Sequence, residues 1–325
     1  MLIALKLSCQ LNSGVLVGKP PKVRRGTATE ETLEVAVASP LEFAVIADVR
    51  AGLGESPVWD IDGNCLWWVD IDGRRLLRTD ADTDRTESWA MPEPTGFMVL
   101  TDAGLPAVGL GTGVFLFNPR NLSLEPLVRI EDEGVRFNDA TVDSSGRLWA
   151  GTMDLALDTP RGALFSIDAD LVARRRMSGL MVQNGLAADA DRGWLYVSDS
   201  HWNVQKIWRC PLDLATGALG KRELFVDMME KPGRPDGAAL DRSGNYWIAS
   251  IEGRVLHVFT PDGMLAASHP TPFSAPTKAA FGGPGLDEVY LTSKGGDAPD
   301  GALARGRFGN GTDKPAGLPA HRWKI

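Results

Sequence analysis

Residues 136–154 read RFNDATVDSSGRLWAGTMD, and this stretch decides the fold class of the chain. The run DSSG at 143–146 is a turn signal, because aspartate bonds its own backbone and glycine accepts a positive φ. Short runs rich in β-forming residues lie before and after it, and Trp149 gives the second run an aromatic residue. The stretch therefore predicts two β-strands joined by a tight turn.

The same turn-and-strand unit recurs along the chain, with successive starts 41 to 52 residues apart. Helical periodicity is nearly absent, and short β-rich runs separated by turns dominate. A period of ~40–50 residues with several strands in each unit is typical of a β-propeller. The six units start at Asp60, Thr101, Asp143, Asp189, Asp241 and Gly282.

Six such units predict an all-β protein, a six-bladed β-propeller that occupies residues 41–325 as one domain. A strand expected at residues 42–47 closes the last blade, because a closed ring leaves no long exposed edge. Residues 1–40 are interpreted as a poorly ordered N-terminal extension. A β-sandwich or a tandem pair of domains is the alternative, but no linker rich in proline and serine divides the chain.

Composition excludes several classes of partner. The net charge of −8 argues against nucleic acid, and no run approaches the ~20 apolar residues of a membrane span. Cys9, Cys65 and Cys210 are too few and too scattered for a disulfide framework, which favours a cytoplasmic location. A closed ring of this size can stand alone as a monomer.

Four acidic or amide residues each stand five positions before the turn of their own unit. Taken singly, an asparagine or aspartate before glycine is usually a turn residue, and a lone glutamate is usually solvated. The shared offset instead predicts one station on the inner strands of four blades, where the oxygens meet around a hard cation. The donor set leaves Ca²⁺, Zn²⁺, Mn²⁺ and Fe²⁺ as alternatives. The four residues are Glu55, Asn138, Asn184 and Asp236.

Five long segments resemble the gluconolactonase / SMP-30 / regucalcin family, over about residues 42 to 300. They are LGESPVWD, RFNDATVDSSGRLWAGTM, NGLAADADRGWLYVSDS, RPDGAALDRSGNYWIA and FGGPGLDEVYLTS. The resemblance implies a six-bladed propeller that holds one divalent cation near the mouth of its channel. The ligands it implies are Glu55, Asn184 and Asp236, with Asn138 bound directly or through water.

The resemblance also implies that Arg136 contacts the substrate and that Asp236 is the general base. Such a site suits the opening of a sugar lactone to an aldonic acid, because the metal polarises the lactone carbonyl while Asp236 activates water. A non-catalytic, regulatory cation-binding propeller is the competing hypothesis. An ester or phosphotriester hydrolase on the same fold is the other. Arg136 and a base together favour catalysis, since simple cation binding needs neither.

The chain departs from the family pattern at Ala156, where many relatives have an acidic substrate-binding residue. Asp154 or Asp158 is expected to substitute for it, and Asp154 is predicted to accept a substrate hydroxyl. Asp199 is predicted to orient a metal ligand without touching the metal. His269 is expected at the surface.

Overall fold

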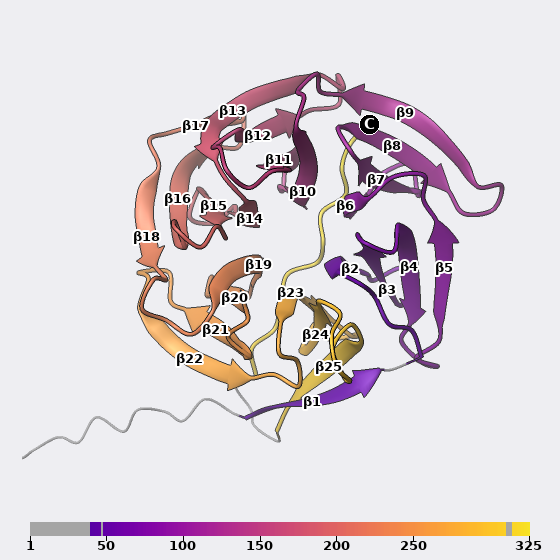
Figure 1. Ribbon diagram of the computed structural model, residues 1–325, viewed down its shortest axis with the longest axis vertical. Coiled ribbons are helices and arrows are strands. Elements are labelled where there is room, and N and C mark those ends of the chain that lie inside the picture. Colours follow the sequence, from indigo (N-terminus) through magenta and orange to yellow (C-terminus); the bar gives the residue numbers. More distant parts are fainter. Residues whose placement is uncertain (1–39, 47, 310–313) are drawn as a thin grey trace, which may run out of the picture. The chain divides into compact units, whose positions relative to one another are not determined.

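The computed structural model describes residues 40–46, 48–309 and 314–325. Within these ranges, 25 strands form six antiparallel sheets arranged around a central channel (Figure 1). The predicted six-bladed propeller is therefore confirmed. The predicted N-terminal extension lies outside the described residues, apart from Pro40. No described segment forms a helix with the length and apolarity that a membrane crossing needs.

Each of the first five blades is built from strands that follow one another along the chain, starting at the channel and ending at the rim. Blade one comprises β2 (Gly54–Asp60), β3 (Cys65–Asp70), β4 (Arg75–Asp80) and β5 (Thr86–Ala90). Blade two comprises β6 (Thr95–Leu100), β7 (Pro106–Leu110), β8 (Gly113–Asn118) and β9 (Ser123–Arg129). Blade three comprises β10 (Val135–Val142), β11 (Leu148–Asp154), β12 (Gly162–Ile167) and β13 (Ala173–Leu180).

Blade four carries one additional short strand, β17, beside β16. It comprises β14 (Gln183–Asp189), β15 (Trp194–Asp199), β16 (Lys206–Asp213), β17 (Ala218–Leu219) and β18 (Glu223–Asp227). Blade five comprises β19 (Arg234–Leu240), β20 (Tyr246–Ile251), β21 (Val255–Phe259) and β22 (Leu265–Pro270). Blade six comprises β23 (Pro276–Gly282), β24 (Glu288–Ser293), β25 (Leu303–Phe308) and β1 (Leu41–Ile46).

The ring is closed by the first strand of the described chain. β1 pairs antiparallel with β25, from Leu41 opposite Phe308 to Ile46 opposite Leu303. The predicted closure of the last blade by the strand near residues 42–47 is confirmed. Because β1 covers the outer edge of β25, the inner three strands of blade six have no unpaired edge.

The aspartate that opens a unit connects its turn to the following aromatic residue. In blade three, Asp143 accepts hydrogen bonds from the backbone N–H groups of Ser145 and Arg147. It also accepts one from the indole of the fully buried Trp149, at 2.9 Å. Asp241 and Trp247 repeat this contact in blade five, again at 2.9 Å. One carboxylate thus satisfies both a tight turn and a buried indole, which otherwise lacks a partner.

The C-terminal segment, residues 314–325, crosses the ring on the side where the inner strands end (Figure 1). Gly317 bridges to Asp241 of blade five, and Trp323 bridges to Thr101 of blade two. Trp323 is fully buried, and its indole donates to the Ile167 carbonyl of blade three at 3.1 Å. The segment therefore fastens several blades together.

Candidate functional site

The structure places the four candidate ligands at one station on the inner strands, as their common offset predicts. Glu55 lies on β2, Asn138 on β10, Asn184 on β14 and Asp236 on β19, and all four are buried. The pairing of each inner strand with its neighbour shifts register at or beside the candidate residue. Such a bulge takes a residue out of the regular ladder and redirects its side chain.

Hydrogen bonds connect the amides of neighbouring blades. The side-chain N–H of Asn138 donates to Oδ1 of Asn184 at 3.1 Å, and the Asn184 amide donates to the Ser200 hydroxyl at 2.8 Å. Ser200 in turn donates to the Pro235 carbonyl, next to Asp236, at 2.5 Å. The sequence interpretation missed Ser200, although it directly follows Asp199. It sets the orientation of Asn184 and ties blade four to blade five.

The two carboxylates are buried and oppose each other electrostatically. The pKa of Glu55 is raised to about 7, first by burial and then by the charge of Asp139. The pKa of Asp236 is raised well above its usual value, first by burial and then by the charge of Glu55. The Glu55 carboxylate accepts only the Ser56 N–H among described residues, and that of Asp236 accepts no hydrogen bond from them. The ionised form of two buried carboxylates with so few hydrogen bonds is stabilised by a cation beside them.

The donor set of the station fits a divalent cation. No group of three or more histidine, cysteine, aspartate or glutamate side chains suited to a metal occurs within the described ranges. A metal held between Glu55 and Asp236 would therefore draw its other protein ligands from Asn138 and Asn184. Carboxylate and amide oxygens are the donors that hard divalent cations prefer.

Arg136 lies beside this station. One guanidinium nitrogen donates to Oδ1 of Asn138 and to the Phe137 carbonyl, each at 2.8 Å. Burial lowers the pKa of Arg136, while the charges of Asp72, Glu55 and Asp236 act in the opposite direction. The guanidinium thus belongs to the same electrostatic cluster as the two carboxylates, and it fixes the amide of Asn138.

Two further predicted residues hold backbone in place. The Asp154 carboxylate accepts the N–H groups of Asp158 and Thr159, at 3.0 and 3.1 Å, which closes the loop after β11. Its predicted contact with a substrate hydroxyl stays a prediction. The Asp199 carboxylate accepts the N–H groups of residues 181 and 182, at 2.7 and 3.1 Å. Asp199 thereby positions the start of β14, the strand that carries Asn184.

A buried ion pair lies one residue beyond the station. Nζ of Lys278, on β23, contacts Oδ1 of Asp139, on β10, at 2.5 Å. The other Asp139 oxygen accepts the Leu186 N–H of β14 at 2.8 Å. The sequence interpretation singled out neither charge. A signal was present, because each follows its strand's station by one position, after Asn138 in RFND and after Thr277 in PTK.

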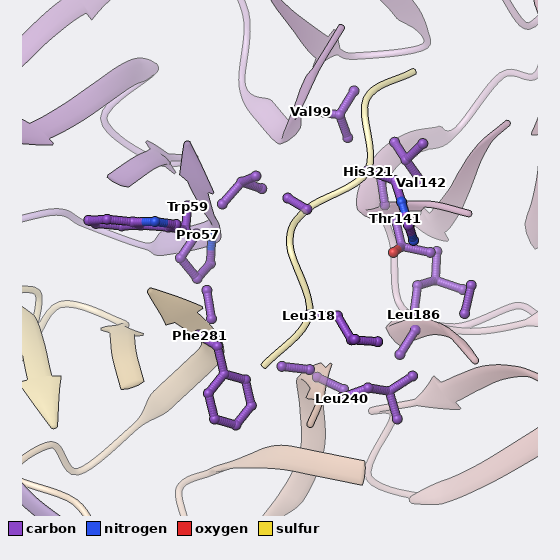
Figure 2. A pocket seen from close by; sticks show the side chains of 18 of the residues that line it. Pro57, Trp59, Val99, Thr141, Val142, Leu186, Leu240, Phe281, Leu318 and His321 are labelled. Carbon is purple, nitrogen blue, oxygen red and sulfur yellow. The ribbon is translucent and has the colours of Figure 1, made fainter. Parts of the chain in front are cut away.

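A separate cavity of about 160 Å³ lies in the other half of the channel (Figure 2). The later residues of the inner strands line it, including Val99, Leu186 and Phe281, and residues 318–321 of the C-terminal segment border it. Lys278 lines this cavity, but none of the four candidate ligands does. The lysine of the ion pair thus borders a chamber that the candidate ligands do not line.

Comparisons with known proteins agree with this architecture. A family model for the SMP-30/gluconolactonase/LRE-like region matches residues 53–295. A 6-deoxy-6-sulfogluconolactonase of Pseudomonas putida is 39% identical over 245 residues, 74% of this chain and 83% of that protein. Pentonolactonase XacC of Haloferax volcanii is 35% identical over 267 residues, 80% of this chain and 88% of that protein.

A solved structure of a calcium-binding protein, regucalcin, from Agrobacterium tumefaciens has the same fold. The TM-score is 0.81 at 24% identity, over 89% of this chain and all of that one. The extent of the family match and the identity to curated relatives go further than the shared fold. The chain belongs to the SMP-30/gluconolactonase/LRE-like family.

Proposed function

We propose that this protein is a metal-dependent lactonase that opens sugar lactones to aldonic acids. The observation that carries the proposal is the pair of buried, mutually repelling carboxylates, Glu55 and Asp236, at one station with two amides and Arg136. The names of the two relatives above, both sugar lactonases, support the substrate class.

The residues divide the chemistry between them. A divalent cation held by Glu55, Asp236, Asn184 and Asn138 would supply Lewis acidity toward the lactone carbonyl. Asp236 takes a proton from the attacking water, a role open to a carboxylate that lies beside the cation. Water oxygen bonds to the carbonyl carbon, the ring acyl–oxygen bond breaks, and the released alkoxide takes up the proton. Arg136 donates hydrogen bonds to substrate oxygens.

The test is a pH-indicator assay with gluconolactone, xylonolactone and arabinonolactone. Acid release above the spontaneous rate is expected, and it is lost with a chelator, restored by added divalent cation and lost in Asp236→Ala. The matched control is Asp262→Ala, an exposed aspartate between β21 and β22, which keeps full activity. If no lactone is opened while cation binding is intact, the protein is a binding propeller and the proposal is wrong. A preference for esters or phosphotriesters would contradict the substrate class.

A further inference from the structure

The buried pair of Asp139 and Lys278 has no role in the reaction above, yet it lies directly behind the candidate cation site. Their side chains are 2% and 7% exposed, and their contact is 2.5 Å. They belong to blades three and six, which face each other across the six-bladed ring (Figure 1). The pair therefore spans the channel.

The chain makes room for this lysine. Gly237, next to Asp236, lies under its aliphatic stem, and a Cβ at Gly237 would be 2.4 Å from both Cβ and Cγ of Lys278. Any larger residue at 237 would displace the lysine. The ammonium group also lies 3.3 Å from the Ala140 carbonyl. The Lys278 side chain thus crosses the backbone of β19, which carries Asp236. Its ammonium group reaches acceptors on β10, which carries Asn138.

The charges in this region can be counted from the residues. Glu55, Asp139 and Asp236 bring three carboxylates into one buried cluster, and Lys278 is the cation in direct contact with one of them. Its contact with Asp139 leaves Glu55 and Asp236 without a direct ion pair among the described residues, while the guanidinium of Arg136 adds one positive charge to the cluster. The charge of Asp139 raises the pKa of both Glu55 and Asp236, and the charge of Lys278 lowers both. Both charges therefore act on the candidate ligands.

We propose that Lys278 selects the charge of the cation that the site accepts. By neutralising Asp139, it limits the carboxylate charge that acts on the cation to the two unit charges of Glu55 and Asp236, and so limits the extra attraction that a trivalent ion gains over a divalent one. Lys278 is a positioning and specificity-determining residue that acts through charge and does not touch the cation. This inference rests on the cation site of the proposed function.

A charge series tests it, with Ca²⁺ and Tb³⁺ as probes of similar size and different charge. Lys278→Met makes the cluster more negative by one, and Asp139→Asn makes it less negative by one. The double variant Asp139→Asn/Lys278→Met restores the original count. Calorimetry of the full chain gives both dissociation constants, and chemical denaturation confirms that each variant is folded.

The expected readout is the ratio of the Ca²⁺ and Tb³⁺ dissociation constants. One unit charge acts more strongly on a trivalent than on a divalent ion, so Lys278→Met should shift the ratio toward Tb³⁺ by about tenfold or more. Asp139→Asn should shift it the opposite way by a similar factor, and the double variant should return it to the wild-type value. If Lys278→Met does not fold, the other two variants still decide the question.

Ratios that stay equal across the series, or a double variant that does not recover the wild-type ratio, overturn the proposal and leave the pair a structural role. If the wild-type protein nevertheless binds Ca²⁺ and opens lactones, the proposed function stands. Wild-type protein that binds neither ion overturns the cation site itself, and the inference about Lys278 with it.

Discussion

Glu55 is held where its ionised form is unfavourable. It lies at a bulge of an inner strand, is 7% exposed, and shares the cluster with two other carboxylates. Burial therefore raises its pKa from 4.5 to about 7 in the metal-free protein. A cation beside it would reverse this effect, because opposite charge favours the ionised carboxylate.

Stability of the metal-free protein should fall as pH rises from about 4.5 to about 7. In this window the unfolded chain has released the Glu55 proton while the folded chain retains it, so folding is progressively disfavoured. The loss is on the order of 3 kcal/mol in the free energy of unfolding. Urea denaturation between pH 5 and pH 8, in the presence of a chelator, measures it.

Glu55→Gln is the matched variant for this measurement, since it keeps the shape of the side chain and removes its titration. Its stability should vary less across the same pH range. Saturating divalent cation should abolish the decline in the wild type, because binding favours the deprotonated site. A wild-type profile that is flat without cation would contradict the assignment of a buried, protonated Glu55.

At the residue scale, the sequence predicts which positions share a station but not what surrounds them. The offset of five residues places Asn138 and Asn184 on equivalent strands, and they hydrogen-bond. Asp139 and Lys278 are 139 residues apart, and only the closed ring brings them together. The expectation for His269 is wrong, because it is buried and stacks on Trp247 with ring centroids 5.4 Å apart.

At the scale of the elements, the aspartate turns hold the blades in shape. Asp143 satisfies two backbone N–H groups of its own turn and the indole of Trp149. It also pairs with Arg147 at 3.2 Å, and both side chains are buried. The repeated Asp/Gly turn in the sequence is therefore more than a break between strands, since it anchors the core of the following strand.

Asp143→Ala should lower the free energy of unfolding by about 2–3 kcal/mol, because it leaves the buried Trp149 indole without a partner and removes one of the two carboxylates that pair with the buried Arg147. Urea denaturation with a divalent cation absent measures the loss. Asp262→Ala, at an exposed position in another turn, should change stability by less than about 0.5 kcal/mol. Equal stability of the two variants would show that the turn contact contributes little.

The glycines after Asn184 and Asp236 show what local sequence preference leaves open. Taken alone, Asn-Gly and Asp-Gly are turn signals. Both pairs instead lie within strands, β14 and β19, where Gly185 adopts a φ of 62° at a bulge. The positive φ is a local property that the sequence indicates, but its use inside a strand depends on the packing of neighbouring blades.

At the scale of the whole molecule, the repeat length is sufficient to predict the ring, and the first strand to predict its closure. The path of the C-terminal segment is not readable from the repeat, because its contacts lie on blades far away in the sequence. Trp323 is an example. Its indole donates a hydrogen bond to the Ile167 carbonyl, and its backbone N–H donates one to the Leu100 carbonyl at 2.8 Å.

Trp323→Ala should cost about 3–5 kcal/mol of stability, because it removes a fully buried aromatic side chain that contacts two blades. Cation affinity of the folded variant should stay within about twofold of wild type, since this segment borders the chamber that none of the four candidate ligands lines. Denaturation and calorimetry measure the two quantities. His321→Ala, at an exposed position of the same segment, is the control and should be nearly neutral.

The ion pair across the ring also has a consequence for how the protein responds to salt. Asp139 and Lys278 are 2% and 7% exposed, so dissolved ions have little access to their contact. Salt screens exposed charges far more than buried ones, so high ionic strength should leave this link between blades three and six intact.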